Sequence, residues 1–496
     1  MRGWALGLCA ILLHGMPGTA VSGLPDDFAA ALERAGVKPQ QISIWFGEAS
    51  SAEARFHWLP ETPRNPASVL KLVTTAQALD TLGPQYRWTT TAWAEGPLRR
   101  APCKRAGTDA RCHDRGDTLD GRLVLSAGGD PRLRREDLRA LFAQVRAAGI
   151  RHIQGDIELD RSAFALPSHD PGAFDGQPQR AYNVGADALL VDFAAISVNV
   201  RAATAPATAP QAWLEPALDG IALDNRLRVI EGACADWRLR PLMRIEAEPV
   251  SAATRAAGIR VTLEGDMPAS CSAASIDIAP IGAAEYSRRA VRQAWQDAGG
   301  TLSGTVRDGR ISYGMRNVGE WRSPALADLV RDINRFSNNV MADHLWLTTG
   351  AAAGGWPTTR EKATTATLEW LHTVDAADTE TRIDSGSGLS RLTRVSVQQL
   401  HAVLRHMAAS PLFPEFAASL PIAGEDGTAS KLQVRAHARL KTGSLNGVRA
   451  AAGYVRDRDG KWLSLVVMLE DAPEQGWRAL LAWLVERAAL SDGPLP

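Results

Sequence analysis

The secondary structure that the sequence predicts changes along the chain, and this change most limits the folds that the chain can adopt. From about residue 90 to 310 the sequence consists of short candidate strands separated by glycine and proline turns, and from about 312 it becomes strongly helical. A chain of 496 residues is also too long for one compact core. We therefore expect two or three domains.

One pattern occurs twice in the middle part. Apolar residues recur at helical spacing over 138–145 and again over 291–298, and each helix leads into a candidate strand. These two units lie far apart in the sequence but can pair within one subdomain, with the residues between them forming another. We interpret the pattern as a nested insertion.

Outside the middle part, several segments of the chain clearly predict strands, turns or helix starts. Residues 41–59 predict a strand, a turn and a strand, and Ser323-Pro324 predicts a helix start with a capping hydroxyl. The dipeptide Asp459-Gly460 predicts a hairpin turn between two strands. The segment 476–490 predicts a final helix whose apolar face packs on the preceding sheet, with peripheral contact to a membrane surface as the alternative.

The N-terminus has the pattern of an export signal over residues 1–22. Arg2 supplies the positive start, "WALGLCAILL" (4–13) is apolar, and "GMPGTA" (15–20) offers small residues for cleavage. The apolar run is shorter than the roughly 20 residues that span a bilayer. We expect an exported, periplasmic protein without a transmembrane anchor; a buried N-terminal helix is the alternative.

Four cysteines remain after the signal, namely Cys103, Cys112, Cys234 and Cys271. An even number in an exported chain favours disulfides, and of the three possible pairings short loops favour Cys103–Cys112 and Cys234–Cys271. A zinc site is the alternative, but the sequence has no CxxC pair and no HExxH. We expect no metal and no cofactor. Lys plus Arg and Asp plus Glu both number 55, a balance that argues against nucleic acid as a partner.

The stretch "RNPASVLKLVTT" (64–75) places Lys71 three residues after Ser68 in an apolar helical pattern. A serine hydroxyl needs a base within hydrogen-bond reach to act as a nucleophile. Residues three apart lie on one face of a helix, and burial lowers the pKa of a lysine, so Lys71 can serve as that base. A Ser-x-x-Lys match alone is weak, because it also occurs on solvated helix faces.

Two further elements make the pattern specific. "RFSNNVMADHL" (335–345) supplies Ser-x-Asn as Ser337 and Asn339, and "RLKTGSLNG" (439–447) supplies Lys441, Thr442 and Gly443 at the start of a predicted strand. The three elements in this order are the known signature of class A β-lactamases and penicillin-binding proteins.

The sequence resembles the D-Ala-D-Ala carboxypeptidase/endopeptidase family, the class C low-molecular-mass penicillin-binding proteins. Besides the motifs, "GGDPRL" (128–133), "YNVGADAL" (182–189) and "LPIAGEDGT" (420–428) resemble family landmarks, and the likeness covers essentially the whole mature chain. It implies an α+β fold: a serine β-lactamase/transpeptidase-like domain, an antiparallel sheet flanked by helices, with two nested inserted domains rich in β-structure. We expect the catalytic domain at 23–89 and 312–496, the first inserted domain at 90–198 and 278–311, and the second at 199–277.

The resemblance also implies the reaction. Ser68 would attack the carbonyl between two terminal D-alanines of a peptidoglycan stem peptide, and water would hydrolyse the acyl-enzyme. Attack on a cross-link would make the protein an endopeptidase, and β-lactam antibiotics would be covalent inhibitors. Lys71 would take the proton from Ser68, and Ser337 would relay it to the leaving nitrogen.

The remaining motif residues would bind substrate. Asn339 would bind a peptide amide of the substrate, and Lys441 and Thr442 would meet its carboxylate. Gly443 would leave room for the substrate along the strand edge, and the backbone N–H groups of Ser68 and Ser444 would form the oxyanion hole. Two departures from the family pattern stand out: Asn338 in the second motif, and "DSGSGLSR" (384–391), where Ser385 occupies an aspartate place.

Two other functions compete with this interpretation. A β-lactamase shares the three motifs, but the insertion is too large for that fold and no Glu-x-x-x-Asn-like element follows Ser337. A catalytically silent peptidoglycan-binding protein is the second alternative, against which the retention of all three motifs weighs. The sequence leaves open the balance between carboxypeptidase and endopeptidase activity.

Overall fold

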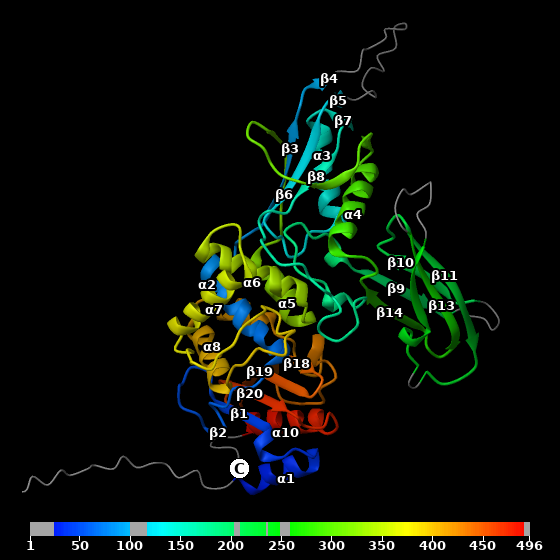
Figure 1. Ribbon diagram of the computed structural model, residues 1–496. Coiled ribbons are helices and arrows are strands. Elements are labelled where there is room, and N and C mark those ends of the chain that lie inside the picture. The colour runs from blue at the N-terminus through cyan, green and yellow to red at the C-terminus, as the bar shows by residue number, and fades with distance from the viewer. Residues whose placement is uncertain (1–23, 100–116, 203–208, 235–236, 249–257, 491–496) are drawn as a thin grey trace, which may run out of the picture.

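The computed structural model describes residues 24–99, 117–202, 209–234, 237–248 and 258–490 (Figure 1). The expected export signal (1–22) and the expected Cys103–Cys112 bridge lie outside these residues and stay predictions. Among the helices of the described ranges, none is both long and apolar enough to cross a membrane.

An antiparallel sheet of five strands joins the two ends of the chain. In spatial order its strands are β18 (Ala438–Leu445), β19 (Val448–Arg456), β20 (Trp462–Glu470), β1 (Ile42–Glu48) and β2 (Phe56–Trp58). β1 and β20 are buried along nearly their whole length, as expected for strands with both faces covered. The predicted strand pair at 41–59 and the hairpin at Asp459-Gly460 are both confirmed.

Helices cover both faces of this sheet. On one face α1 (Asp26–Ala35) and α10 (Trp477–Leu490) contact each other, and α10 contacts β19 and β20. The apolar side chains of α10 are buried there, so the predicted packing on the preceding sheet is confirmed. The other face carries a helical layer, in which α8 (Val397–Ala409) contacts β1 and β20 directly. This layer comprises α2 (Lys71–Leu82), α5 (Leu326–Phe336), α6 (Asn339–Gly354), α7 (Arg360–Thr373), α8 (Val397–Ala409) and α9 (Phe413–Ser419).

The middle part of the chain forms two sheets with α3 (Arg135–Ala147) and α4 (Ala283–Asp297) packed together. One sheet has the order β16 (Val306–Gly309), β8 (Ile157–Asp160), β6 (Arg122–Ala127), β3 (Thr89–Glu95) and β17 (Arg316–Arg322). The other has the order β15 (Thr301–Leu302), β7 (Ile150–Ile153), β5 (Asp117–Leu119) and β4 (Leu98–Arg99). β15 pairs with β7 and β16 with β8, so the two helix-to-strand units do come together as predicted.

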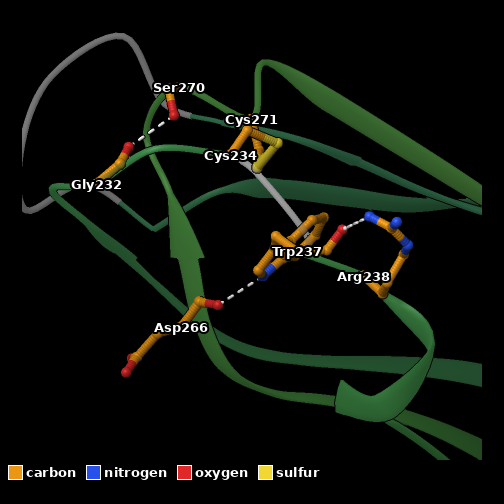
Figure 2. The surroundings of a disulfide bond; sticks show 7 residues. All are labelled: Gly232, Cys234, Trp237, Arg238, Asp266, Ser270 and Cys271. Atoms are coloured by element: carbon orange, nitrogen blue, oxygen red, sulfur yellow. Dashed lines mark hydrogen bonds between the residues drawn. A yellow bond between two sulfur atoms is a disulfide. The ribbon is translucent and has the colours of Figure 1, made fainter.

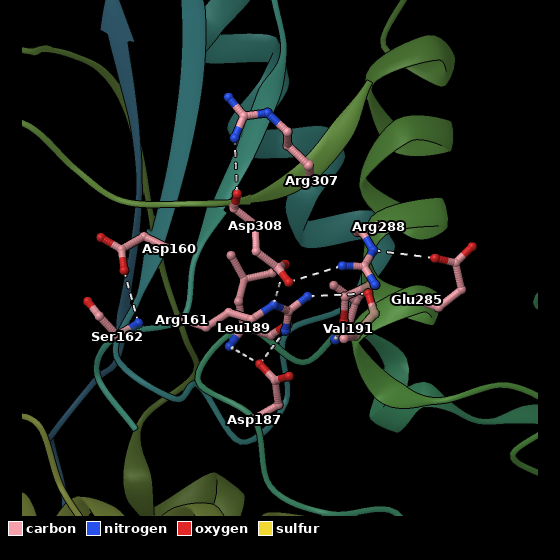
Figure 3. Close-up of polar contacts among 12 residues, drawn as sticks. Asp160, Arg161, Ser162, Asp187, Leu189, Val191, Glu285, Arg288, Arg307 and Asp308 are labelled. Carbon is pink, nitrogen blue, oxygen red and sulfur yellow. Dashed lines mark hydrogen bonds and ion pairs between the residues drawn. The ribbon is translucent and has the colours of Figure 1, made fainter. Parts of the chain in front are cut away.

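An arginine ties the segment after β8 to this structure. Arg161 forms ion pairs with Asp187 and Asp308, and Arg288 on α4 reaches the same Asp308 at 3.0 Å (Figure 3). The loop that runs on toward the helical layer is thereby anchored to β16 and α4.

Two three-stranded sheets lie beside this part (Figure 1). Their orders are β10 (Gln211–Glu215), β9 (Ile196–Arg201), β14 (Ala273–Ile278), and β11 (Ile221–Ile230), β13 (Gly258–Pro268), β12 (Met243–Glu248). The predicted Cys234–Cys271 disulfide is present, and Trp237 beside it donates a hydrogen bond from its indole N–H to the Asp266 carbonyl at 2.8 Å (Figure 2). The domain boundaries at residues 90, 199, 278 and 312 remain our proposal.

One predicted helix start is wrong. Ser323 does not cap α5, whose first residue is Leu326 and whose N-cap is Ala325. The Ser323 hydroxyl instead accepts a hydrogen bond from the Trp88 backbone N–H at 3.0 Å and donates to the Pro324 carbonyl at 2.8 Å. The hydroxyl therefore joins the chain before the helix to the segment after α2, and is not free to cap.

Candidate active site

Ser68 lies in a tight turn at the start of the first helix of the helical layer. The 3₁₀ helix η2 (Ala67–Leu70) carries Ser68 and continues into α2. Asn65 shapes this turn, because its side chain accepts a hydrogen bond from the Ala67 N–H and donates one to the Ser390 carbonyl, both at 2.8 Å. Ser68 itself is only half-buried, so its hydroxyl is held in place while remaining accessible.

Lys71 is fully buried directly beneath that hydroxyl. Its Nζ lies 3.1 Å from Ser68 Oγ, 2.8 Å from Asn339 Oδ1 and 2.6 Å from the Ser387 carbonyl oxygen. Burial lowers the pKa of Lys71 to about 7, although the negative charge of Asp343 acts in the opposite direction. A substantial fraction of the amine is therefore neutral near pH 7 and can accept the Ser68 proton.

Ser337 and Lys441 form a second pair. Ser337 ends α5 in a left-handed conformation with φ 57°, and Lys441 on β18 donates to Ser337 Oγ at 3.0 Å and to the Thr442 carbonyl at 2.6 Å. Burial, together with the positive charge of Lys71, holds the pKa of Lys441 well below its usual value. Lys71 thus lies close enough to Lys441 to lower its pKa electrostatically.

The second motif also builds a helix terminus. The Asn338 side chain accepts a hydrogen bond from the Met341 N–H and caps α6, so this residue has a structural use. Asn339 is the first residue of α6, and both ends of its amide are engaged. Its Oδ1 accepts from Lys71, and its Nδ2 donates to the Tyr182 carbonyl at 3.1 Å. A loop of the middle part thereby contacts a motif residue directly.

The third motif brings the edge of the central sheet against the serine turn. An added Cβ on Gly443 would lie 2.7 Å from the Pro66 carbonyl oxygen and 3.0 Å from the Ser68 backbone nitrogen. Glycine is therefore needed here so that β18 can approach the turn, a reason that the sequence did not reveal. Ser444 follows as an exposed residue, and the Thr442 hydroxyl donates to Thr428 Oγ1 at 2.7 Å.

We predict that Gly443→Ala slows acylation by a β-lactam about tenfold or more, because the new methyl group collides with backbone atoms and displaces the serine turn. The rate constant for covalent labelling by a fluorescent penicillin measures this effect. Gly282→Ala is the matched control, since a Cβ there meets nothing within 4 Å. An unchanged labelling rate in Gly443→Ala would show that the turn does not depend on this close approach.

The 384–391 loop departs from the family pattern but is well braced. The Asp384 carboxylate accepts hydrogen bonds from the Ser390 and Thr393 hydroxyls, both at 2.7 Å, and the Ser385 hydroxyl accepts one from the Gly388 N–H at 3.1 Å. Asp384, which lies one residue before the aspartate position of the family pattern, therefore still fixes the loop that supplies the Ser387 carbonyl to Lys71.

A cavity of about 630 Å³ opens beside this loop. It lies between the 166–186 segment of the middle part and the 384–392 loop, and Asp343 and Trp346 of α6 also line it. Ser387, whose carbonyl oxygen accepts a hydrogen bond from Lys71, belongs to the lining of this cavity, whereas Ser68 and Lys71 do not.

Several residues of the site could not be recognised from the motifs. Asp343 had a weak signal, since it lies one helical turn after Asn339 on α6. Thr428 lies in the 420–428 segment, whose only signal is its likeness to the family. The Ser387 and Tyr182 carbonyls are backbone groups, which leave no signature in the sequence. In the part of the chain that the structure describes, no group of three or more His, Cys, Asp or Glu residues could hold a metal ion, and Cys234 and Cys271 are bonded to each other.

An α+β core in which a sheet edge meets a Ser-x-x-Lys turn with a buried lysine is the arrangement of serine acyl-transfer enzymes, the penicillin-binding proteins and β-lactamases among them. Residues 27–487 match the D-Ala-D-Ala carboxypeptidase 3 (S13) family. The chain belongs to this family and is a serine-type D-Ala-D-Ala carboxypeptidase.

Curated relatives and solved structures agree with this assignment. The D-alanyl-D-alanine carboxypeptidase of Actinomadura sp. (strain R39) is 26% identical over 479 residues, covering 90% of this chain and 80% of that relative. D-alanyl-D-alanine carboxypeptidase DacB of Haemophilus influenzae is 24% identical over 432 residues, covering 81% of this chain and 79% of that relative.

The crystal structure of penicillin binding protein 4 (dacB) from H. influenzae matches with a TM-score of 0.70 at 21% identity, over 93% of this chain and 98% of that one. Its complex with a novel β-lactam gives a TM-score of 0.67, also at 21% identity and over 93% and 98% of the two chains. The expected fold class is thereby confirmed.

Proposed function

We propose that this enzyme is exported to the periplasm and removes the terminal D-alanine from peptidoglycan stem peptides, with Ser68 as the nucleophile. The observation that carries the proposal is the contact of Lys71 Nζ with Ser68 Oγ at 3.1 Å, in a buried site where the pKa of Lys71 falls to about 7. The Cys234–Cys271 disulfide supports export, since such bonds persist in oxidising compartments.

The first chemical step is acylation. Neutral Lys71 takes the Ser68 proton, and the oxygen attacks the carbonyl of the penultimate D-alanine while the backbone N–H groups of Ser68 and Ser444 hold the oxyanion. As the C–N bond breaks, Ser337 relays the proton taken up by Lys71 to the leaving nitrogen, so that Lys71 is neutral again and D-alanine departs. Water then attacks the ester carbonyl, the bond to Ser68 Oγ breaks, one proton of the water returns to Oγ, and the shortened peptide leaves with a free carboxyl group.

Substrate recognition falls to the third motif and Asn339. A substrate carboxylate beside Lys441 and Thr442 would favour the protonated form of Lys441, opposing the effects of burial and of Lys71. The amide of Asn339 would then face a substrate peptide group. The same geometry would cleave a D-alanyl cross-link, which makes endopeptidase activity part of the proposal.

We expect β-lactams to acylate Ser68 covalently, since they present a reactive carbonyl to the same machinery. The H. influenzae protein of the same fold has been crystallised with a β-lactam, which supports this expectation. A β-lactamase and a catalytically silent peptidoglycan-binding protein are the competing functions.

The test uses the mature protein with purified muropeptides. Uncross-linked pentapeptide should lose one D-alanine and cross-linked dimers should be split, as read by mass spectrometry, and a penicillin adduct should map to the peptide that contains Ser68. Rapid nitrocefin turnover would instead favour the β-lactamase. Intact muropeptides together with no adduct would favour the silent binding protein.

A further inference from the structure

The short turn formed by Gly386 and Ser387 is held tightly between two helices of the helical layer. From α2, the Thr74 hydroxyl donates to the Gly386 carbonyl at 2.6 Å. On the other side, Gly386 packs closely against α6, because an added Cβ on this glycine would lie 2.3 Å from Trp346 Cβ and 2.6 Å from the Ala342 carbonyl oxygen. These contacts pack the turn against both helices.

Asp343 binds the same turn through both of its carboxylate oxygens. Its Oδ1 accepts from the backbone N–H groups of Gly386 at 2.8 Å and Ser387 at 3.0 Å, and its Oδ2 accepts from the Ser387 hydroxyl at 3.2 Å. A buried carboxylate is costly unless it is hydrogen-bonded in this way. These three bonds fix the position of Ser387.

Ser387 in turn orients the amine of Lys71. Its carbonyl oxygen, at 2.6 Å, is nearer to Lys71 Nζ than either Asn339 Oδ1 or Ser68 Oγ. An ammonium group has three donors, and these three acceptors account for all of them. One helix thus directs the amine twice, through Asn339 at its first residue and, one turn later, through Asp343 and the turn.

Among the described residues, few charged groups lie around Asp343 and Lys71. The positive charge of Lys71 lowers the pKa of Lys441 on β18, and the positive charges of Lys71 and of Arg360 on α7 act to lower the pKa of Asp343. The nearby Asp384 of the 384–391 loop is engaged by Ser390 and Thr393. Burial raises the pKa of Asp343, and the two cations and its hydrogen bonds oppose this rise.

We propose that Asp343 is a positioning residue for the acylation step, because it fixes the Ser387 carbonyl that aims the Lys71 amine at Ser68. In this role Asp343 acts on the reaction through the Ser387 carbonyl and Lys71. The inference rests on the proposed roles of Ser68 and Lys71, and it deepens them.

The test compares Asp343→Asn with the wild type over a pH series of penicillin acylation rates. We expect a loss of about tenfold or more, since small displacements of a catalytic group cost this much. We also expect the midpoint of the rising limb to move to lower pH, because the charge that holds up the pKa of Lys71 is gone. A purely structural role would lower the melting temperature but leave both the acylation rate of the folded protein and the midpoint in place.

Two further variants keep the inference open to refutation if Asp343→Asn folds poorly. Thr74→Val removes the other bond to the turn but keeps the carboxylate, so we expect a several-fold slower acylation with an unchanged midpoint. Glu369→Gln removes an exposed carboxylate from α7 and should change neither quantity. The inference is overturned if Asp343→Asn and Thr74→Val both acylate with the wild-type rate and midpoint. If Asp343→Asn cannot be purified, an unaltered acylation rate in Thr74→Val overturns it.

The mapped adduct separates this inference from the proposed function. If the wild-type penicillin adduct does not map to Ser68, the proposed function itself fails. If it does map there and the variants behave as wild type, only the role of Asp343 fails.

Discussion

Replacing Ser68 with alanine should abolish covalent penicillin labelling and lower peptidase turnover by at least about 10⁴-fold, because we propose that its hydroxyl forms the acyl-enzyme. The fold should persist, since the change removes one half-buried hydroxyl whose contact in the structure is a hydrogen bond from Lys71. Muropeptide products identified by mass and fluorescent penicillin labelling measure the two effects independently.

Ser272→Ala is the control for this change. Ser272 is an exposed serine far from the site in the chain, and its loss should leave both readouts at the wild-type level. Residual labelling or hydrolysis in purified, folded Ser68→Ala would mean that a different residue is the nucleophile.

Lys71→Met should lower the acylation rate by about 10²- to 10⁴-fold, the usual contribution of a general base. Methionine fills a similar volume, but Asn339 Oδ1 and the Ser387 carbonyl both lose a buried donor. Some loss of thermal stability should therefore accompany the loss of rate.

The pH dependence gives this prediction its sign. A protonated lysine cannot accept the Ser68 proton, so the wild-type acylation rate should fall as the pH drops through about 7, the pKa of Lys71. The slow residual reaction of Lys71→Met should lack this limb. Lys461→Met, at the exposed tip of the β19–β20 hairpin, should keep both the rate and the limb. A limb near pH 7 that survives in Lys71→Met would assign the titration to another group.

The motifs of the sequence go far toward locating the site. Two motifs fall at element starts, with Ser68 just before α2 and Asn339 at the first residue of α6, whereas Lys441 lies in the middle of β18. The structure brings all three together, with Lys71 bonded to Ser68 and Asn339, and Lys441 bonded to Ser337.

Interactions between residues that are distant in the chain could not be predicted from the sequence. Ser323 precedes a proline just before a helical pattern, which predicts a cap, yet its hydroxyl is taken by Trp88, a residue more than two hundred positions earlier. Gly443 was explained by space for the substrate, whereas the backbone of Pro66 and Ser68 is what lies against it. No local pattern can report a partner that only the folded chain brings near.

The hydrogen bond from the Asn339 amide to the Tyr182 carbonyl bears on any attempt to make a smaller enzyme. Joining residue 89 to residue 312 would keep all three motifs but delete the acceptor that steadies this asparagine, and the lysine beside it would lose a well-oriented neighbour. We therefore expect a protein shortened in this way to bind β-lactams and peptide substrates poorly, even if its remaining core folds.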